Sequence, residues 1–357
     1  MKHSERTREL LIKHYQKYPS LQMADIFKYI HQSTFGCEHL VSSLQAATDY
    51  ISAEYENTSL PEDAPLVEPL DGAYSRVYLT WLNQGLSAQT FGKLFFESAK
   101  TETDGKAEAE NKLAVAHALA SENSLPFPAD AFEKAALQWQ QNNYPAMHHS
   151  EAFRNTYHPA YRVIANKYIP FLPLFSALDN ALQNNEHTVL AIEGGSASGK
   201  STLSEMLHTI YDCTVLHMDD FFLRPEQRTP ERFAEIGGNI DYERFENEVL
   251  TSLRKSEPIC YRKFNCSTQT LSEAVTVTQK KLMVVEGVYA LHPKFGQYYD
   301  HAVFLDISPE LQRVRITKRN TPDMAKMFFE KWIPLENAYF ENMQTKARCD
   351  LTITVQA

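Results

Sequence analysis

The sequence predicts an α/β domain with a doubly wound parallel sheet, preceded by a mostly α-helical domain. Residues 1–185 carry apolar side chains at helical spacing and show no convincing strand-like alternation. After residue 187, apolar runs rich in β-branched residues alternate with helical patterns, which is the order of a parallel sheet. A phosphate-binding motif opens this second part. We therefore expect a helical domain over residues 1–185 and the α/β domain over residues 186–357.

The motif runs from Gly194 to Ser201 and fits G-x-x-x-x-G-K-[ST], between an apolar strand pattern and a helical pattern. Glycines let the backbone curl around phosphate oxygens, while backbone N–H groups and the helix N-terminus attract anions. Lys200 can reach the β- and γ-phosphates, and the Ser201 hydroxyl can bind Mg²⁺. The motif predicts a P-loop NTPase domain that binds ATP. The expected ATP-binding residues are Gly194, Gly195, Ser196, Ala197, Ser198, Gly199, Lys200, Ser201 and Thr202.

Composition narrows the range of partners. The 357 residues have a net charge of −10 and no long Lys/Arg run, which argues against broad nucleic-acid binding. The five cysteines form no C-x-x-C pair, so a reducing compartment fits best. The N-terminus lacks an apolar signal core and no run reaches membrane-span length. We expect a cytoplasmic protein that binds ATP and a small molecule, without nucleic acid or membrane, and leave homo-oligomerisation open.

The first half is expected to consist of helices joined by loops. Pro61, Pro65 and Pro69 mark one of these loops. Helices are expected at Ser4–Tyr18, Met23–Ile30, Glu38–Tyr55, Tyr74–Leu82, Ala88–Ala99, Lys106–Ser121 and Ala129–Gln141.

Two histidine-containing stretches of this half leave its role open. One spans His31 to His39, and the other begins with His148, His149 and Glu151. Such side chains could ligate a metal or line an anion pocket. Alternatively, they cap helices, pair with each other and hold the interface to the second domain. Convergence of Arg76, Arg154 and Arg162 would favour an anionic ligand.

In the second half, acidic residues follow two buried strand patterns. Asp219 and Asp220 end the run that starts at Thr214, and Glu286 ends the run that starts at Lys281. Ligands of doubly wound sheets lie outside the carboxyl ends of the strands, so these carboxylates should face the nucleotide. Asp219 could accept a proton from an attacking hydroxyl, and Glu286 could belong to the magnesium shell.

A basic helix follows the next strand pattern and begins at Ser308-Pro309-Glu310. Arg315 and Arg319 lie one helical turn apart, with Lys318 adjacent. These three groups suggest a lid that faces phosphate, whereas the alternative is an ordinary solvated helix face.

The second half resembles the uridine kinase/phosphoribulokinase-like family, P-loop kinases that phosphorylate hydroxyls of small metabolites. The resemblance rests on the P-loop, Met218-Asp-Asp-Phe-Phe, Asn239-Ile-Asp241, Val285-Glu-Gly and the basic helix, in that order. His217-Met-Asp-Asp-Phe-Phe and Lys331-Trp-Ile-Pro-Leu-Glu-Asn-Ala-Tyr are similar to the nicotinamide riboside kinase branch. The resemblance covers none of the helical half.

The resemblance implies a role for each matching residue. Lys200 and Ser201 would serve the phosphates and Mg²⁺, with Glu286 in the shell of the metal. Asp219 would be the general base. Asp241 and Arg315 would hold sugar hydroxyls of the acceptor, Tyr261 would contact its base, and Arg319 or Lys318 would close over the transferring phosphoryl group.

The pattern departs from the family after Tyr261. The family places an acidic residue next, whereas this chain has Arg262 and Lys263. The histidine and arginine expected shortly afterwards are missing, and the spacing in the basic helix differs by about one residue. The sequence therefore predicts an ATP- and Mg²⁺-dependent kinase, with a nucleoside 5′-hydroxyl as the best acceptor. The alternatives are a kinase for a phosphosugar or vitamin precursor, and an ATP-dependent sensor whose helical half binds an effector.

Overall fold

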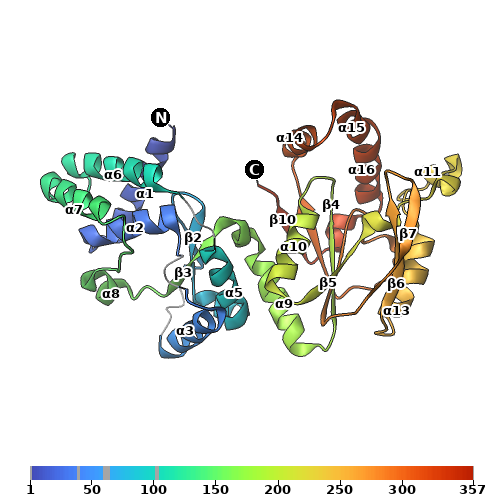
Figure 1. The fold of residues 1–357 in the computed structure, drawn as a ribbon, viewed down its shortest axis with the longest axis horizontal. Helices are drawn as coiled ribbons and strands as arrows, with labels where there is room; N and C mark the ends of the chain where they lie inside the picture. The colour runs from blue at the N-terminus through green and yellow to red at the C-terminus, as the bar shows by residue number, and fades with distance from the viewer. Residues whose placement is uncertain (1, 38–40, 59–64, 101–103, 357) are drawn as a thin grey trace. The chain divides into compact units, whose positions relative to one another are not determined.

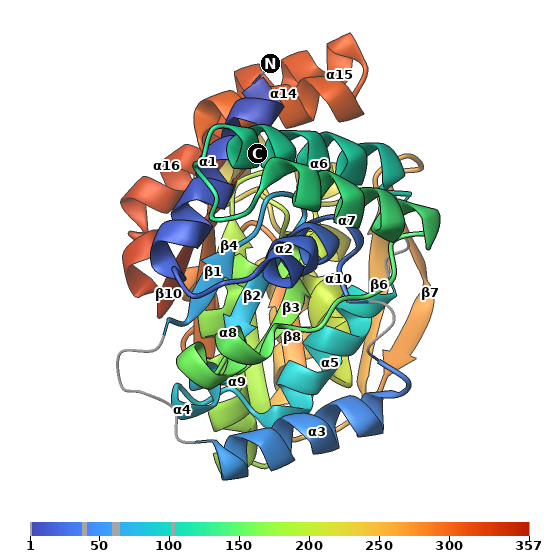
Figure 2. The same ribbon diagram turned by 90° about the vertical axis from the view of Figure 1, so that its left-hand side faces the viewer.

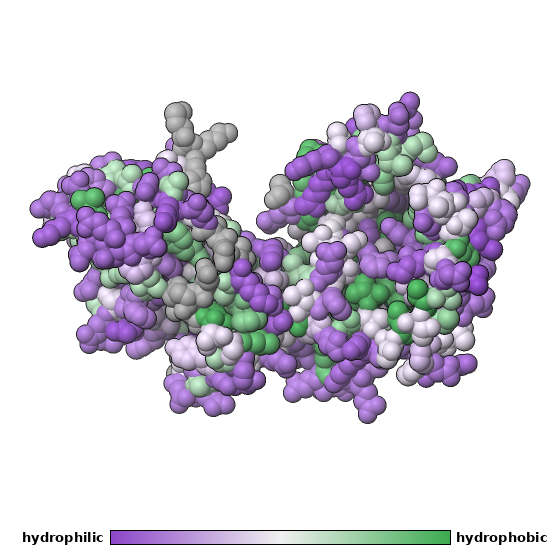
Figure 3. All heavy atoms as spheres, in the orientation of Figure 1, coloured by the Kyte–Doolittle hydropathy of each residue, from purple (hydrophilic) through white to green (hydrophobic). Residues whose placement is uncertain are grey.

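The computed structural model describes residues 2–37, 41–58, 65–100 and 104–356. The chain divides into two compact units, Met1–Ala177 and Leu178–Ala357, which are called the N-terminal and the C-terminal unit below. The division falls inside helix α9 (Leu172–Asn184). Among the described residues, no helix combines the length and the apolar character that crossing a bilayer requires. The surface shown in Figure 3 is mainly hydrophilic, with small scattered apolar patches.

The N-terminal unit is mostly helical, as predicted (Figure 1). Helices α6 and α7 pack against each other, α1 and α2 pack against α6, and α3 packs against α5 (Figure 2). The helices expected over residues 88–99, 106–121 and 129–141 form with those bounds. The helices of this unit that precede α9 are α1 (Lys2–Lys17), α2 (Met23–Phe35), α3 (Leu44–Asn57), α4 (Thr80–Asn83), α5 (Ala88–Ala99), α6 (Lys106–Ser121), α7 (Ala129–Gln141) and α8 (Glu151–Tyr157).

A three-stranded antiparallel sheet inside this unit corrects the expectation that no strand precedes Thr188. Its order is β1 (Val67–Pro69), β2 (Tyr74–Tyr78) and β3 (Tyr161–Ala165). The helix expected at Tyr74–Leu82 is therefore wrong: the segment forms β2 and then the short α4. All five residues of β2 are buried. A strand that is buried on both faces is not expected to alternate between polar and apolar residues, which is the pattern that marks a half-buried strand. Pro69, expected in a loop, ends the edge strand β1, where a missing N–H is tolerated.

The C-terminal unit confirms the predicted doubly wound parallel sheet (Figure 1). All four strand pairs in this sheet are parallel, and the order is β10-β9-β4-β8-β5. Its strands are β4 (Thr188–Gly194), β5 (Cys213–His217), β8 (Leu282–Glu286), β9 (His301–Asp306) and β10 (Leu351–Thr354). The apolar runs of β4 and β8 are buried along their whole length, as expected of central parallel strands.

Helices and one hairpin complete this unit. Residues 242–253 are helical throughout, as α12 (Tyr242–Phe245), a π-helical turn (Glu246–Leu250) and α13 (Thr251–Leu253). An antiparallel hairpin of β6 (Ile259–Asn265) and β7 (Thr270–Val277), which the sequence did not predict, carries Tyr261. The other helices are α10 (Lys200–Ile210), α11 (Pro230–Ala234), α14 (Pro309–Arg319), α15 (Pro322–Met327) and α16 (Ile333–Asn342).

Candidate active site

The P-loop connects β4 to α10, as the motif predicts. Gly194 has a φ of +143°, and a Cβ there would lie 2.6 Å from the carbonyl oxygen of Leu305. Only glycine fits this position without distortion. The Lys200 Nζ donates to the carbonyl oxygens of Gly194 at 2.8 Å and Gly195 at 3.0 Å. The lysine thus folds back on its own loop, from where it can turn toward a bound phosphate.

The structure brings the two predicted metal ligands together. Strands β4 and β8 are neighbours, and the Ser201 hydroxyl donates to Oε1 of Glu286 at 3.1 Å. These are oxygen donors of the kind that Mg²⁺ prefers, and they leave other positions of its shell to phosphates and water. His217 at the end of β5 lies with Nδ1 2.6 Å from the same oxygen, and this contact raises the pKa of His217. The residues therefore fit a magnesium ion.

Asp219 lies in the 3₁₀ turn Met218–Phe221, which directly follows β5. Its side chain is exposed and makes no hydrogen bond or ion pair with the described residues. Nearby protein nonetheless displaces enough water to raise the pKa of this carboxyl, an effect that Lys200 opposes and Glu286 reinforces. Asp219 is thus a carboxylate near Lys200 that has no partner among the described residues.

The neighbouring Asp220 has partners. It accepts a hydrogen bond from the Tyr261 hydroxyl at 3.3 Å and lies 3.6 Å from the Lys263 ammonium. The Tyr261 ring is buried and stacks on Phe221. Tyr261 and Lys263 therefore occupy Asp220. Asp219, which has no partner among the described residues, remains available to an acceptor.

Asp241, expected to hold sugar hydroxyls, caps helix α12. Its Oδ1 accepts from the backbone N–H of Arg244 at 3.1 Å, and its Oδ2 lies 3.6 Å from the guanidinium of Arg244. This Oδ2 is buried and has no hydrogen-bond partner among the described residues. The carboxylate therefore stabilises the local fold and keeps one acceptor free.

Of the three basic residues in the lid hypothesis, only Arg315 on α14 has a described contact with the P-loop. The Arg315 guanidinium donates to the carbonyl oxygens of Ala197 at 3.2 Å and Gln356 at 3.0 Å. Arg315 and Asp241 therefore engage different partners. The Arg319 guanidinium lies over the Phe328 ring, 5.6 Å from its centroid, and both Arg319 and Lys318 are exposed. Their phosphate contacts remain a prediction.

Two carboxylates that the sequence reasoning missed support the P-loop. Glu193 is fully buried and accepts from the N–H groups of Gly194 and Leu291 and from the Tyr339 hydroxyl. Burial raises the pKa of Glu193 to about 7. Glu336 on α16 accepts from the backbone N–H of Ser196 at 2.8 Å and from the hydroxyl of Ser196, and burial raises its pKa.

Both carboxylates had a signal in the sequence. Glu193 directly precedes the first motif glycine on a strand that is otherwise apolar. Glu336 lies in the Lys331–Tyr339 stretch that carries part of the family resemblance. Neither signal identifies the partner of the carboxylate, because that depends on which segments pack together.

The histidine stretches of the N-terminal unit form no metal site among the described residues. His149 is buried, with Nδ1 2.8 Å from Asp25 and Nε2 2.5 Å from the Tyr161 hydroxyl, which agrees with the pairing alternative. His39 lies outside the described residues.

Arg76, Arg154 and Arg162 do not share a partner. Arg76 binds Glu68 and Gln32, Arg162 binds Glu54, and Arg154 lines a cavity. The convergence that would have favoured an anion at all three is therefore absent.

Comparison with known proteins supports the interpretation of the C-terminal unit as a P-loop kinase. Residues 189–326 match the model of the Phosphoribulokinase / Uridine kinase family. Uridine kinases from two strains of Staphylococcus epidermidis are 26% identical to this chain over 155 residues, which cover 40% of this chain and 72% of theirs. The resemblance that the motifs indicate is confirmed for this region, and it supports an ATP-dependent kinase.

Solved structures that resemble part of this chain include a possible uridine kinase from Bacillus stearothermophilus and two shikimate kinases. The first is 21% identical with a TM-score of 0.38, and the match covers 50% of this chain and 98% of that chain. The shikimate kinase from Bacteroides thetaiotaomicron is 12% identical with a TM-score of 0.26, covering 47% and 86%. The one from Aquifex aeolicus is 18% identical with a TM-score of 0.24, covering 47% and 87%.

Proposed function

We propose that the C-terminal unit transfers the γ-phosphoryl group of ATP to a hydroxyl of a small metabolite, with a nucleoside 5′-hydroxyl as the preferred acceptor. The observation that carries this proposal is the state of Asp219. A pure ATP-binding module has no need for an exposed, unpaired carboxylate with a raised pKa next to the P-loop lysine. The names of the matched relatives, both uridine kinases, favour a nucleoside as the acceptor.

In the proposed reaction Asp219 accepts the proton of the acceptor hydroxyl as that oxygen attacks the γ-phosphorus. Its raised pKa makes the carboxylate a stronger base than an ordinary aspartate. Lys200 leaves the carbonyl oxygens of Gly194 and Gly195 and binds phosphate oxygens instead. Ser201 and Glu286 would hold Mg²⁺, which neutralises phosphate charge when bound. The protein thus contributes mainly alignment and charge stabilisation.

A second acceptor class is favoured by one specific contact. Lys263 lies 3.6 Å from Asp220, the residue after the proposed base, and Arg262 precedes it on the exposed face of β6. A cation beside the acceptor position would suit an acceptor that carries its own phosphate or carboxylate. A phosphosugar or a charged vitamin precursor is therefore the alternative to an uncharged nucleoside.

Turnover against an acceptor panel tests both proposals. The full-length protein is incubated with ATP, Mg²⁺ and single acceptors: uridine, cytidine, nicotinamide riboside, ribose 5-phosphate and pantothenate. Formation of ADP together with a phosphorylated acceptor, detected by mass spectrometry, is the expected result for a nucleoside. Product only from an anionic acceptor would favour the second class. Slow ADP formation that no acceptor accelerates would contradict the kinase proposal and favour the sensor.

The base assignment is tested by Asp219→Asn. We expect turnover to fall by roughly 10²-fold or more with ATP affinity within a few-fold of wild type. The matched control is Asp212→Asn, because Asp212 is an exposed aspartate that directly precedes the same strand at its other end. Turnover of Asp219→Asn close to that of Asp212→Asn would refute the assignment.

A further inference from the structure

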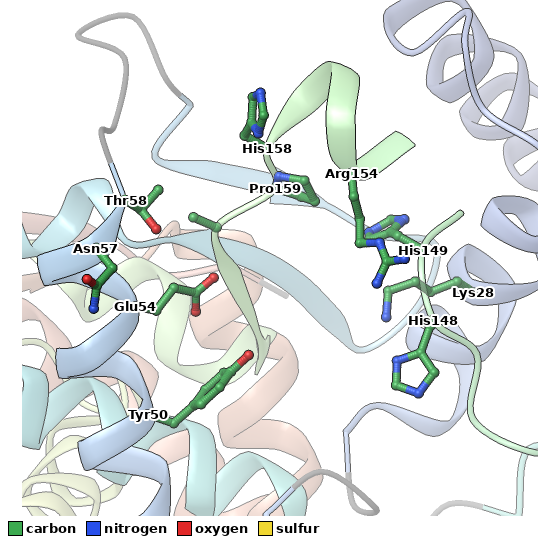
Figure 4. A pocket seen from close by; sticks show the side chains of 11 residues that line it. Lys28, Tyr50, Glu54, Asn57, Thr58, His148, His149, Arg154, His158 and Pro159 are labelled. Carbon is green, nitrogen blue, oxygen red and sulfur yellow. The ribbon is translucent and has the colours of Figure 1, made fainter. Parts of the chain in front are cut away.

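The N-terminal unit contains a cavity of about 650 Å³ that the proposed kinase chemistry does not use. Its size lies within the range of small-molecule sites. Lys28 of α2, His148, His149 and Arg154 of α8 line one side, and Tyr50 and Glu54 of α3 line the other (Figure 4). The two sides thus differ in charge.

Two side chains on the cationic side, those of Lys28 and Arg154, have no acidic partner among the described residues. The Lys28 ammonium donates to the carbonyl oxygen of Met147 at 3.0 Å and makes no ion pair with a described residue. The Arg154 side chain makes no hydrogen bond or ion pair with the described residues. Figure 4 shows the Arg154 guanidinium directed toward Lys28 and His149, with His148 on the same side.

The surroundings hold this side in place. His149 is fixed between Asp25 and Tyr161, and its ring stacks on Phe153 at a centroid distance of 4.1 Å. Ser150 donates to Asp25 through both its N–H and its hydroxyl, and its hydroxyl also caps α8. The backbone that carries His148 and Arg154 is therefore anchored to α2 before any ligand arrives.

Burial disfavours the charged form of a lysine, and so does the charge of a nearby cation. Partial burial and the charge of Arg76 lower the pKa of Lys28 to about 8. An anion between Lys28 and Arg154 would remove both penalties. In a chain of net charge −10, two such cations on one cavity wall without a carboxylate indicate a site for an anion.

The opposite side offers groups for the rest of a ligand. Glu54 pairs with Arg162 at 2.6 Å, so its charge is already balanced, and a second acceptor oxygen remains for a ligand hydroxyl. Arg162 also lies over the Tyr50 ring, 4.8 Å from its centroid. Asn57 lines the same side and adds an amide. A cavity of this volume has room for more than an inorganic ion.

We propose that this cavity binds a small phosphomonoester, with its phosphate on Lys28, Arg154 and His148 and its hydroxyls against Glu54 and Asn57. A phosphate presents three acceptor oxygens at one point, so donors from α2, α8 and the segment between α7 and α8 can bind it together. A carboxylate carries one negative charge, whereas a phosphomonoester carries close to two at pH 7 and therefore balances more of the positive charge on this side. The proposal does not depend on the function of the C-terminal unit.

Isothermal titration calorimetry on the full-length protein tests the site. The probes are ribose 5-phosphate, uridine 5′-monophosphate and inorganic phosphate, with ribose and malate as controls for the hydroxyls and for a dicarboxylate. We expect Arg154→Gln and Lys28→Met each to weaken the binding of a phosphomonoester by about tenfold or more. Arg154 is exposed, so its variant should fold normally, which circular dichroism verifies.

Two further variants separate this site from others. Arg8→Gln removes a guanidinium from the same unit, away from the cavity, and should leave the affinity unchanged. Lys200→Ala disables the P-loop and should also leave it unchanged. The proposal is overturned if Arg154→Gln and Lys28→Met bind like wild type, or if Lys200→Ala alone abolishes binding. It is also overturned if malate binds as well as the phosphomonoesters, or if no phosphomonoester binds at about 10 mM.

Discussion

Glu68 in the N-terminal unit and Asp219 in the C-terminal unit are acidic side chains beside a cation, but their surroundings differ. Glu68 is largely buried, accepts from the Arg76 guanidinium at 2.9 Å and from two tyrosine hydroxyls, and also binds Lys17. Asp219 is exposed and has no described partner. A fully paired carboxylate stabilises a fold, whereas an unpaired one remains available to a ligand.

The pKa shifts follow the same division. The cations around Glu68 hold its pKa well below the ordinary range, despite burial. The pKa of Asp219 is raised, because the displacement of water by nearby protein outweighs the effect of Lys200. The network around Glu68 therefore stabilises the N-terminal unit. A ligand of that unit would instead bind at cations that have no acidic partner.

The largest expected effect is the loss of stability in Arg76→Met. Arg76 is fully buried on the central strand β2, and its removal leaves Glu68 buried with fewer cations. Breaking a buried pair costs about 3–5 kcal/mol. Hydrogen exchange in peptides of β2 and β3, followed by mass spectrometry, should accelerate accordingly. Arg162→Met on β3 is the matched control and should cost clearly less, because its partner Glu54 is more accessible. Equal effects would break the comparison.

Lys200→Met should show the opposite behaviour. Its described hydrogen bonds go only to two P-loop carbonyl oxygens, so exchange in β4 peptides should change little. Turnover should fall by roughly 10²-fold or more, since the γ-phosphoryl charge loses its positioned cation. Lys280→Met, which removes an exposed ammonium paired with Asp212, serves as the control. Unchanged turnover and ATP affinity would contradict the role of Lys200.

The two units should respond oppositely to mild acid. Burial lowers the pKa of His14 and of His149 from 6.5 to about 4. Between these values the unfolded chain binds more protons, so the N-terminal unit loses stability as pH falls from 6.5 to 4, by roughly 2–3 kcal/mol for each histidine. Glu193 has a pKa raised from 4.5 to about 7, so its contribution is lost as pH rises from 4.5 to 7. His292, whose pKa burial lowers to about 4, offsets most of the gain from Glu193 on acidification, whereas Glu336 and Asp219, whose pKa values are also raised, add to that gain.

Hydrogen exchange at pH 7 and pH 5, corrected for the intrinsic rate, measures this difference for peptides of each unit. His149→Gln should reduce the pH sensitivity of the N-terminal unit. His148→Gln, with an exposed imidazole at the adjacent position, should not. Equal pH sensitivity of the two units would show that the buried histidines do not control the acid response.

The smallest effect is expected for Glu336→Ala. Glu336 holds both the N–H and the hydroxyl of Ser196, and its loss should loosen the P-loop and raise the KM for ATP by about tenfold. Glu341→Ala on the same helix removes an exposed carboxylate and should leave the KM unchanged. A KM equal in the two variants would mean that the loop keeps its shape without Glu336.

The sequence predicted the parts of the fold that depend on local patterns. The strand–loop–helix around Lys200 and the helices over residues 88–99, 106–121 and 129–141 follow from short-range periodicity and motif chemistry. The sheet of β1, β2 and β3 was missed, because β2 is buried on both faces and β3 pairs with it from a segment about 90 residues later. No local pattern records such a pairing.

The P-loop, the acids after β5 and β8, and the order of strands and helices were determined by the sequence itself, since motif spacing and periodicity are local properties. Only the tertiary structure decided which of these groups bind to other groups of the protein. Ser201 donates to Glu286 and Ser196 donates to Glu336, whereas Asp219 has no partner among the described residues. The tertiary structure also places Lys28 and Arg154 on one cavity. Partners of a charged side chain depend on long-range packing and burial, which determine whether the group stabilises the fold or remains available to a ligand.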